Sequence, residues 1–112
     1  LHLLEGPGND LVSVTALAAA GVQLVLFTTG RGTPYSGPVP TVKIATTTEL
    51  YQKKKHWFDF DAGDILTGIT GLQELAGQLF TYVLDVASGR AYTRNEIYGA
   101  REIAIFKDGV VL

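Results

Sequence analysis

QLVLFTTGRGTPYSGPVPTVKI, residues 23–44, decides the fold, because an apolar strand pattern gives way there to a small polar loop that carries an arginine. Val22 and the residues from Leu24 to Phe27 are apolar, which is typical of a strand buried on both faces in a parallel sheet. Ligands of open α/β sheets bind beyond the carboxyl ends of such strands. The loop that follows this strand is therefore a candidate ligand site.

This loop offers the groups that an anion needs. Its two glycines allow tight backbone turns, its threonine hydroxyls donate and accept hydrogen bonds, and the guanidinium of Arg31 forms a planar fork that fits a carboxylate. From composition alone, two roles for Arg31 are equally well supported: binding a carboxylate, or tying down the loop by donating to carbonyls. The residues concerned are Thr28, Thr29, Gly30, Arg31, Gly32 and Thr33.

A strand and a helix precede this region in the order of a βαβ unit. Leu1–Leu4 is expected to form the first strand, and Asn9 or Asp10 is expected to cap a helix that ends at Gly21. Because such units are almost always right-handed and join parallel strands, we expect a sheet that is parallel at its centre. The turn before this helix can hold an anion on free N–H groups, but it lacks the full G-x-G-x-x-G pattern of a nucleotide site.

The pattern after the loop continues the alternation of strands and helices. Residues 41–45 predict a strand, and Thr46 with Glu49 predicts a capping box at the start of a helix over residues 47–54. The lysines at 53–55 would lie at the C-terminal end of that helix, where the helix dipole favours positive charge, and we prefer this interpretation to a binding patch. Residues 57–61 predict a further strand that stops at Gly63.

The firmest helix is expected after a second capping box at Thr70 and Gln73, because apolar residues recur at helical spacing from Leu72 to Ala87. Ile103–Phe106 and residues 110–112 flank a turn and predict a closing hairpin or edge strand. The expected fold class is α/β: residues 1–112 form a single three-layer Rossmann-like domain with a mostly parallel sheet and a C-terminal β-hairpin or edge strand.

Composition narrows the classes of function. A chain of 112 residues with 46% hydrophobic content and no apolar run of about 20 residues is expected to be one cytoplasmic domain that does not span a membrane. The net charge of −2 provides no basic field for nucleic acid, and the absence of cysteine excludes disulfides and thiolate metal sites. Because the chain has no methionine, we expect it to be a piece of a longer protein.

Clustered carboxylates follow the third predicted strand. Asp59, Asp61 and Asp64 can attract a hard cation or act as acid and base, although we favour the interpretation that they cap the next turn. Residues 94–96, Arg-Asn-Glu, form a second polar cluster that either reaches a ligand or ties down the C-terminal tail. The two histidines are isolated and form no metal motif.

FTTGRGTP, residues 27–34, resembles the C-terminal region of the altronate dehydratase and galactarate dehydratase family. The resemblance extends over essentially the whole chain, and the HWFDFDAG segment and the tail resemble altronate dehydratases more than galactarate dehydratases. Two departures are Tyr35-Ser36-Gly37, where an aromatic residue followed directly by glycine is expected, and Asp61, where asparagine is expected. The other segments that carry the resemblance occur in the same order as in the family: PGND (7–10), VTALAAAG (14–21), VPTVKIAT (39–46), HWFDFDAG (56–63), RNE (94–96) and REIAIFKDGVVL (101–112).

The resemblance implies the C-terminal domain of a sugar-acid hydro-lyase that converts D-altronate to 2-dehydro-3-deoxy-D-gluconate and water, or acts on galactarate. It implies a divalent metal (Fe²⁺, Mn²⁺ or Mg²⁺) bound mainly outside this chain. Arg31 would clamp the substrate carboxylate, with Thr28, Thr29, Gly30, Gly32, Thr33, Asn9 and Asp10 also binding substrate. Asp59, Asp61 and Glu96 would be the catalytic carboxylates.

Two other functions remain open at this point. The first is a noncatalytic packing or oligomerisation module whose partners are the N-terminal part of the same enzyme or a second copy in a homo-oligomer. The second, weaker alternative is a nucleotide-binding regulatory domain that uses the turn from Gly6 to Asp10. Neither nucleic acid nor a membrane is expected as a partner.

Overall fold

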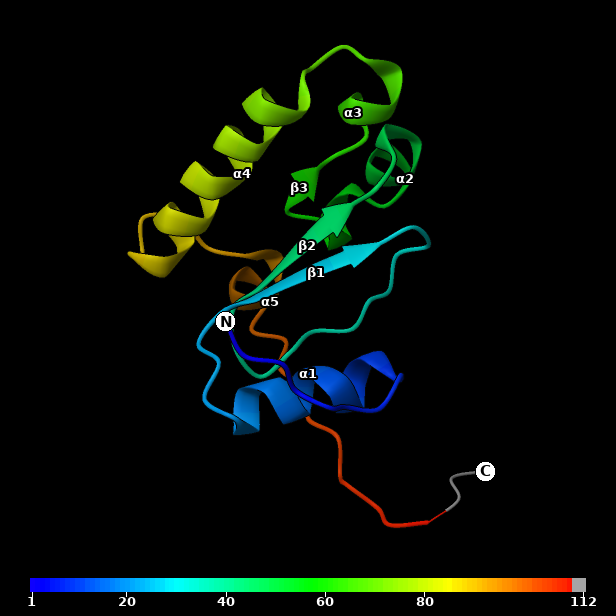
Figure 1. Ribbon diagram of the computed structural model, residues 1–112, viewed down its shortest axis with the longest axis vertical. Helices are drawn as coiled ribbons and strands as arrows, with labels where there is room; N and C mark the ends of the chain where they lie inside the picture. Colours follow the sequence, from blue (N-terminus) through cyan, green and yellow to red (C-terminus); the bar gives the residue numbers. More distant parts are fainter. Residues whose placement is uncertain (110–112) are drawn as a thin grey trace.

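The computed structural model describes residues 1–109 as an α/β fold in which three parallel strands lie between helices (Figure 1). The predicted α/β class with a parallel sheet is confirmed. No helix in the described residues is long and apolar enough to cross a membrane. The elements are α1 (Asp10–Ala19), β1 (Val25–Thr29), β2 (Thr41–Ala45), α2 (Thr48–Lys53), the 3₁₀-helix η1 (Lys55–Trp57), β3 (Phe60–Asp61), α3 (Asp64–Thr67), α4 (Leu72–Ala87) and α5 (Arg94–Ile97).

The sheet has the order β1-β2-β3, so β2 is its central strand. All five residues of β2 are buried, as expected for a strand with neighbours on both edges and helices on both faces. The register places Thr29 opposite Ala45, and Ala45 opposite Asp61. The carboxyl ends of all three strands therefore meet at one edge of the sheet.

One face of the sheet is covered by α1. Asn9 caps this helix by accepting a hydrogen bond from the Val12 amide at 3.3 Å, as the sequence predicts. Val14 of α1 packs with Val25 of β1 and with Tyr35, whose ring lies edge-on to Phe27. The Tyr35-Ser36-Gly37 departure from the family pattern thus belongs to the core and helps to anchor the connection from β1 to β2.

The other face of the sheet is covered by α4, the helix most firmly predicted from the apolar spacing. Val86 packs against Val42 and Ile44 of β2, with Leu79 and Tyr82 beside them. The predicted stripe is only partly core, however, because Leu72 at its start stays exposed; Phe80 and Leu84, which lie outside the stripe, are exposed as well. The helix begins after Gly71 with no side-chain cap, so the capping box predicted at Thr70 is wrong.

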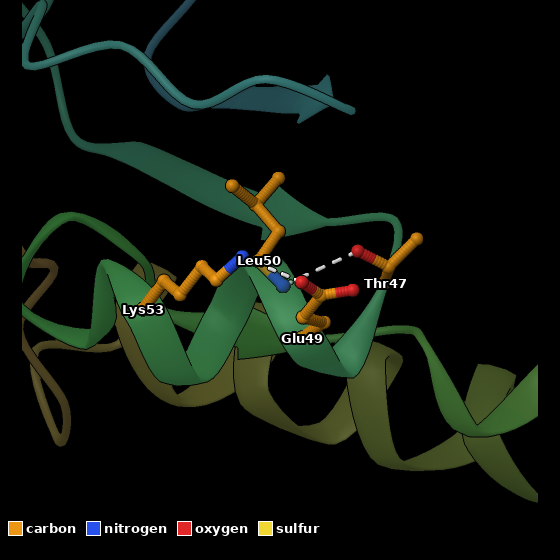
Figure 2. A network of polar contacts seen from close by, with 4 residues as sticks. All are labelled: Thr47, Glu49, Leu50 and Lys53. Atoms are coloured by element: carbon orange, nitrogen blue, oxygen red, sulfur yellow. Dashed lines mark hydrogen bonds and ion pairs between the residues drawn. The ribbon is translucent and has the colours of Figure 1, made fainter.

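Two local predictions shift by a few residues. Thr47, rather than Thr46, caps α2: its hydroxyl accepts from the Leu50 amide at 3.3 Å, while Glu49 pairs with Lys53 instead of closing a capping box (Figure 2). The predicted strand over residues 57–61 is reduced to Phe60–Asp61, because the chain is still in the 3₁₀-helix η1 as far as Trp57.

Both predicted outer strands differ in the structure. Leu1–Leu4 forms no strand, and Leu1 and Leu3 are fully exposed, because no backbone ladder joins this segment to the sheet. Ile103–Phe106 is likewise not a strand, and residues 110–112, the other half of the predicted hairpin, lie outside the described residues. In consequence β1 is an edge strand, and Leu26 is half exposed where burial on both faces was expected.

A pair of glycine substitutions tests the packing at the carboxyl edge. A Cβ at Gly63 would lie 2.0 Å from the Thr48 amide nitrogen, whereas a Cβ at Gly77 on α4 would meet nothing within 4 Å. We expect Gly63→Ala to lower the free energy of unfolding by about 2–3 kcal/mol and Gly77→Ala to raise it by about 0.5–1 kcal/mol. Urea denaturation of both variants measures this, and equal effects would contradict the close contact of α2 with the turn after β3.

Candidate functional site

The loop after β1 is held by its own backbone and by the side chain of Thr29. The Thr29 hydroxyl accepts hydrogen bonds from the amides of Arg31 (3.3 Å) and Gly32 (3.1 Å), which closes a tight turn at the carboxyl edge. Gly32 has φ +74°, a conformation that glycine adopts without strain, and a Cβ there would press on Phe58 and Lys54 at 3.1 Å. The glycine is therefore required by both conformation and space.

Other groups in the structure tie down the loop instead of the Arg31 guanidinium. The ammonium of Lys54 donates to the Arg31 carbonyl at 2.9 Å and lies 4.7 Å from the centre of the Trp57 ring. The Arg31 side chain itself is exposed and makes no hydrogen bond to any of residues 1–109. Of the two roles open for Arg31 at the sequence level, its side chain does not perform the second, tying down the loop, within residues 1–109.

A polar cavity of about 220 Å³ lies beside this loop, lined by Gly30 and by one side of α2. Its walls include Thr47, Glu49, Leu50 and Lys53, and Figure 2 shows their side chains. Glu49 and Lys53 form an ion pair at 2.5 Å, but both side chains are largely exposed, so this pair contributes little to stability. The cavity is open to small polar molecules at the edge where the strands end.

The end of the loop is anchored on a buried lysine that the sequence reasoning did not single out. The Lys43 ammonium donates to the Thr33 carbonyl at 2.9 Å, while the Thr33 hydroxyl accepts from the Tyr35 amide. Lys43 is almost fully buried in β2, and this burial lowers its pKa, although the charges of Asp59 and Glu102 oppose the shift. A lone charged residue inside an apolar strand was the signal that could have revealed it.

Asp61 is the predicted carboxylate that lies at the carboxyl edge. Its Oδ1 accepts from the Gly63 amide at 2.8 Å and from the Thr48 hydroxyl at 3.3 Å, so it joins the end of β3 to the start of α2. These bonds give Asp61 the turn-capping role that we favoured from the sequence.

Asp59 and Glu96 lie elsewhere, around α5. Asp59 accepts backbone hydrogen bonds on both oxygens, from Lys43 at 2.8 Å and from Arg94 at 2.7 Å. Burial raises the pKa of Asp59, and these two bonds and the nearby charges of Arg94 and Lys43 offset part of the shift. Glu96 accepts from both the amide and the hydroxyl of Thr93, which forms a capping box.

Asn95, which lies in α5 between Arg94 and Glu96, connects this helix to the amino end of β2. Its Oδ1 accepts from the Thr41 amide at 3.2 Å, and its amide group donates to the carbonyls of Gly37 and Val39. The hydroxyl of Thr93 also bonds to Asn95. Of the two roles considered for residues 94–96, the geometry favours tying down the chain, at the end of β2 opposite the Arg31 loop.

Asn9 and Asp10 lie at the start of α1, on the side of the sheet where β1 ends (Figure 1). Asn9 is occupied as the helix cap, and within the described residues no hydrogen bond joins either side chain to the loop at residues 28–33. The structure thus gathers the Arg31 loop, the polar cavity and Asp61 at one edge, and leaves Asp59 and Glu96 apart from them.

The donor groups of residues 1–109 do not fit a metal centre. No three His, Cys, Asp or Glu side chains come together in this part of the chain. The three carboxylates predicted to be catalytic also accept hydrogen bonds from the chain itself: Asp59, Asp61 and Glu96. Any divalent metal would therefore need ligands from outside the described residues.

A polar loop beyond the carboxyl edge of an open parallel sheet is the place where α/β domains commonly bind ligands. The family model described as "D-galactarate/Altronate dehydratase, C-terminal" matches residues 1–111, and the chain belongs to this family. It is 54% identical to the altronate dehydratase of Escherichia coli K12 and 51% identical to that of Bacillus subtilis 168, in each case over the whole chain. It is 40% identical to the galactarate dehydratase (L-threo-forming) of Escherichia coli K12 over 94% of its length. The chain spans only about a fifth of the length of these relatives (22% of each altronate dehydratase, 20% of the galactarate dehydratase).

The half-buried carboxylate of Asp59, just before β3, gives a prediction on stability. Asp59→Asn replaces one acceptor oxygen with an amide group that faces a backbone N–H, so we expect the free energy of unfolding to fall by about 1–3 kcal/mol. The folded-state pKa of Asp59 is raised above an unfolded value of about 3.9, so its stabilisation is complete below that value and is lost as pH rises through the folded pKa. Urea denaturation at a series of pH values above 4 should show that the difference in free energy of unfolding between wild type and variant narrows as the pH rises.

Asp108→Asn is the control, because Asp108 is exposed and makes no hydrogen bond within the described residues. Parallel stability curves for wild type and Asp59→Asn across this pH range would contradict the raised pKa of Asp59.

Proposed function

We propose that this chain is the C-terminal domain of a sugar-acid dehydratase, a hydro-lyase that converts D-altronate to 2-dehydro-3-deoxy-D-gluconate and water. The observation that carries the proposal is the match of the whole chain to two altronate dehydratases at 54% and 51% identity. The lower identity of 40% to a galactarate dehydratase supports altronate as the substrate over galactarate. The work of the whole enzyme extends beyond this chain, because its relatives are about five times longer.

In this proposal the loop after β1 binds the carboxylate of the substrate. A dehydration of this kind removes the proton on the carbon next to the carboxylate and the hydroxyl on the following carbon. Negative charge then accumulates on the carboxylate, and a guanidinium placed against it stabilises the transition state more than the ground state. The exposed side chain of Arg31, on a turn fixed by Thr29 and Lys54, supports this role.

The threonine hydroxyls and the polar cavity would serve the sugar hydroxyls. Thr28 is exposed beside Arg31, and Gly30 and Thr47 line the cavity next to the same turn. Hydroxyl groups of this kind donate and accept in turn, which matches the chemistry of a polyol chain. Asn9 and Asp10 would contribute from the start of α1, on the same side of the sheet (Figure 1).

The predicted catalytic carboxylates take more limited roles in this proposal. Asp61 acts as a positioning residue that fixes the turn after β3, since it accepts from Gly63 and Thr48. Asp59 and Glu96 position α5 through their bonds to Arg94 and Thr93. A divalent metal and the groups that exchange protons with the substrate are then proposed to come from the rest of the enzyme.

The sharpest test is Arg31→Ala in the full-length enzyme that carries this chain. We expect kcat/KM for D-altronate to fall on the order of 100-fold or more, because a charged hydrogen bond to the substrate is lost. Arg31→Lys should recover only part of the activity, since an ammonium lacks the planar fork. Formation of the 2-keto acid product measures the rate, and galactarate is assayed in parallel.

Lys55→Ala is the matched control, because Lys55 is exposed and its loss changes the net charge by the same amount. It should leave kcat/KM unchanged. Full activity of a folded Arg31→Ala enzyme would remove the loop from the site, and a preference for galactarate in the wild type would overturn the choice of substrate.

A further inference from the structure

The outer edge of β1 carries backbone groups that no strand pairs within residues 1–109. The Val25 amide donates to the Pro40 carbonyl at 2.9 Å, and the Thr29 carbonyl accepts from the Thr46 amide at 3.3 Å. Because the hydrogen-bonding direction alternates along a strand, the backbone groups of Leu26 and Thr28 point the other way, toward the outer edge. An exposed row of this kind is a template for a further strand.

An apolar groove runs beside this edge, between β1 and α4. It has a volume of about 410 Å³, and all of its lining side chains are apolar: Leu26, Ala76, Leu79, Phe80 and Val83. Leu26 is 50% exposed and Phe80 is 64% exposed. The sequence of β1 has the pattern of a strand that is buried on both faces. The exposure of Leu26 therefore indicates that nothing in the described residues covers this part of the strand.

The segment before α1 is the part of the chain best placed to cover this edge. Figure 1 shows it starting beside the beginning of β1 and then leaving the sheet to pass α1, toward the side on which β1 ends, before it enters the first turn of α1. Leu3 and Leu4 line a second cavity together with Leu17 of α1, Leu24 before β1 and Ala87 of α4. This cavity therefore brings Leu3 and Leu4 near residues of both α1 and α4, the helices that cover the two faces of the sheet.

We propose that, in the longer enzyme, residues 1–5 and the polypeptide that precedes them form a fourth strand, parallel to β1, on the outer edge of β1. α1 runs opposite to β1 (Figure 1), as the helix that joins two adjacent parallel strands does, and such connections are almost always right-handed. Alternation would turn Leu1 and Leu3, both fully exposed here, to one face of the sheet, where they can fill the Leu26–Phe80 groove.

The length of the family members explains why this strand forms in the longer enzyme and not in the isolated chain. Strands commonly have about five or six residues, which residues 1–5 would supply together with the polypeptide before them. The matched region is 22% of each altronate dehydratase, so about four-fifths of the polypeptide is available to extend and hold the segment. The inference requires this longer polypeptide but not the dehydration reaction.

Hydrogen exchange at single-residue resolution on the full-length enzyme tests the inference. We expect the amides of Leu26 and Thr28 to exchange on the order of 100-fold more slowly than unstructured amides. Leu3→Asp should abolish this protection by placing a charge in the groove, whereas Leu3→Ile should keep it. The amides of Val42 and Ile44, paired on the central strand in every form, are the internal reference.

Three outcomes would overturn the inference. Rapid exchange at Leu26 and Thr28 in the wild type would show that the edge of β1 is open. This outcome is measured on the wild-type enzyme alone, so it does not depend on whether a variant folds. Protection that persists in Leu3→Asp would assign the edge to another part of the enzyme, and protection that is lost on dilution would assign it to a second copy. Because exchange is measured without substrate, each result is independent of whether the proposed dehydratase activity is found.

Discussion

The parallel pairing of β2 with both of its neighbours is the constraint on which the rest of the structure depends. It sets Thr29, Ala45 and Asp61 level with one another, so three polar connections leave the sheet at the same edge. The glycine-containing turn after β1, the capped start of α2 and the Asp61 turn come together for this reason. The candidate site is thus a consequence of strand register more than of any one side chain.

Elements whose pattern is local could be predicted from the sequence. The strand at residues 41–45, the helix capped by Asn9 and the long helix over residues 72–87 all form, because burial and capping at these positions follow from nearby residues. The cap predicted at Thr46 is one residue early, since the adjacent Thr47 takes that position, and the helix predicted to be capped by Thr70 begins after Gly71 with no side-chain cap. The flanking strands at residues 1–4 and 103–106 are absent, because a strand needs a partner edge that the local sequence does not specify.

The sequence predicted most of the polar residues of the candidate site, but not which of them lie together in space. The Arg31 loop was found because glycines, threonines and an arginine follow an apolar strand. Asp59 and Asp61 are two residues apart in sequence, yet they face different partners, Arg94 in one case and Gly63 in the other. Lys43 was missed because its role depends on burial against Thr33, a contact that sequence spacing does not show.

The core of the domain, within residues 1–109, is small and divided. The domain's third strand has two residues, its core is divided into two small clusters on opposite faces of the sheet, and many large apolar side chains remain exposed. The polar contacts of Asn95 and Asp59 join α5 to β2 and add to the stability of this arrangement. Such contacts are directional, so they fix the arrangement of the strands accurately while burying little area. A domain built in this way holds the turns at the carboxyl edge of its sheet in place while much of its apolar surface stays exposed.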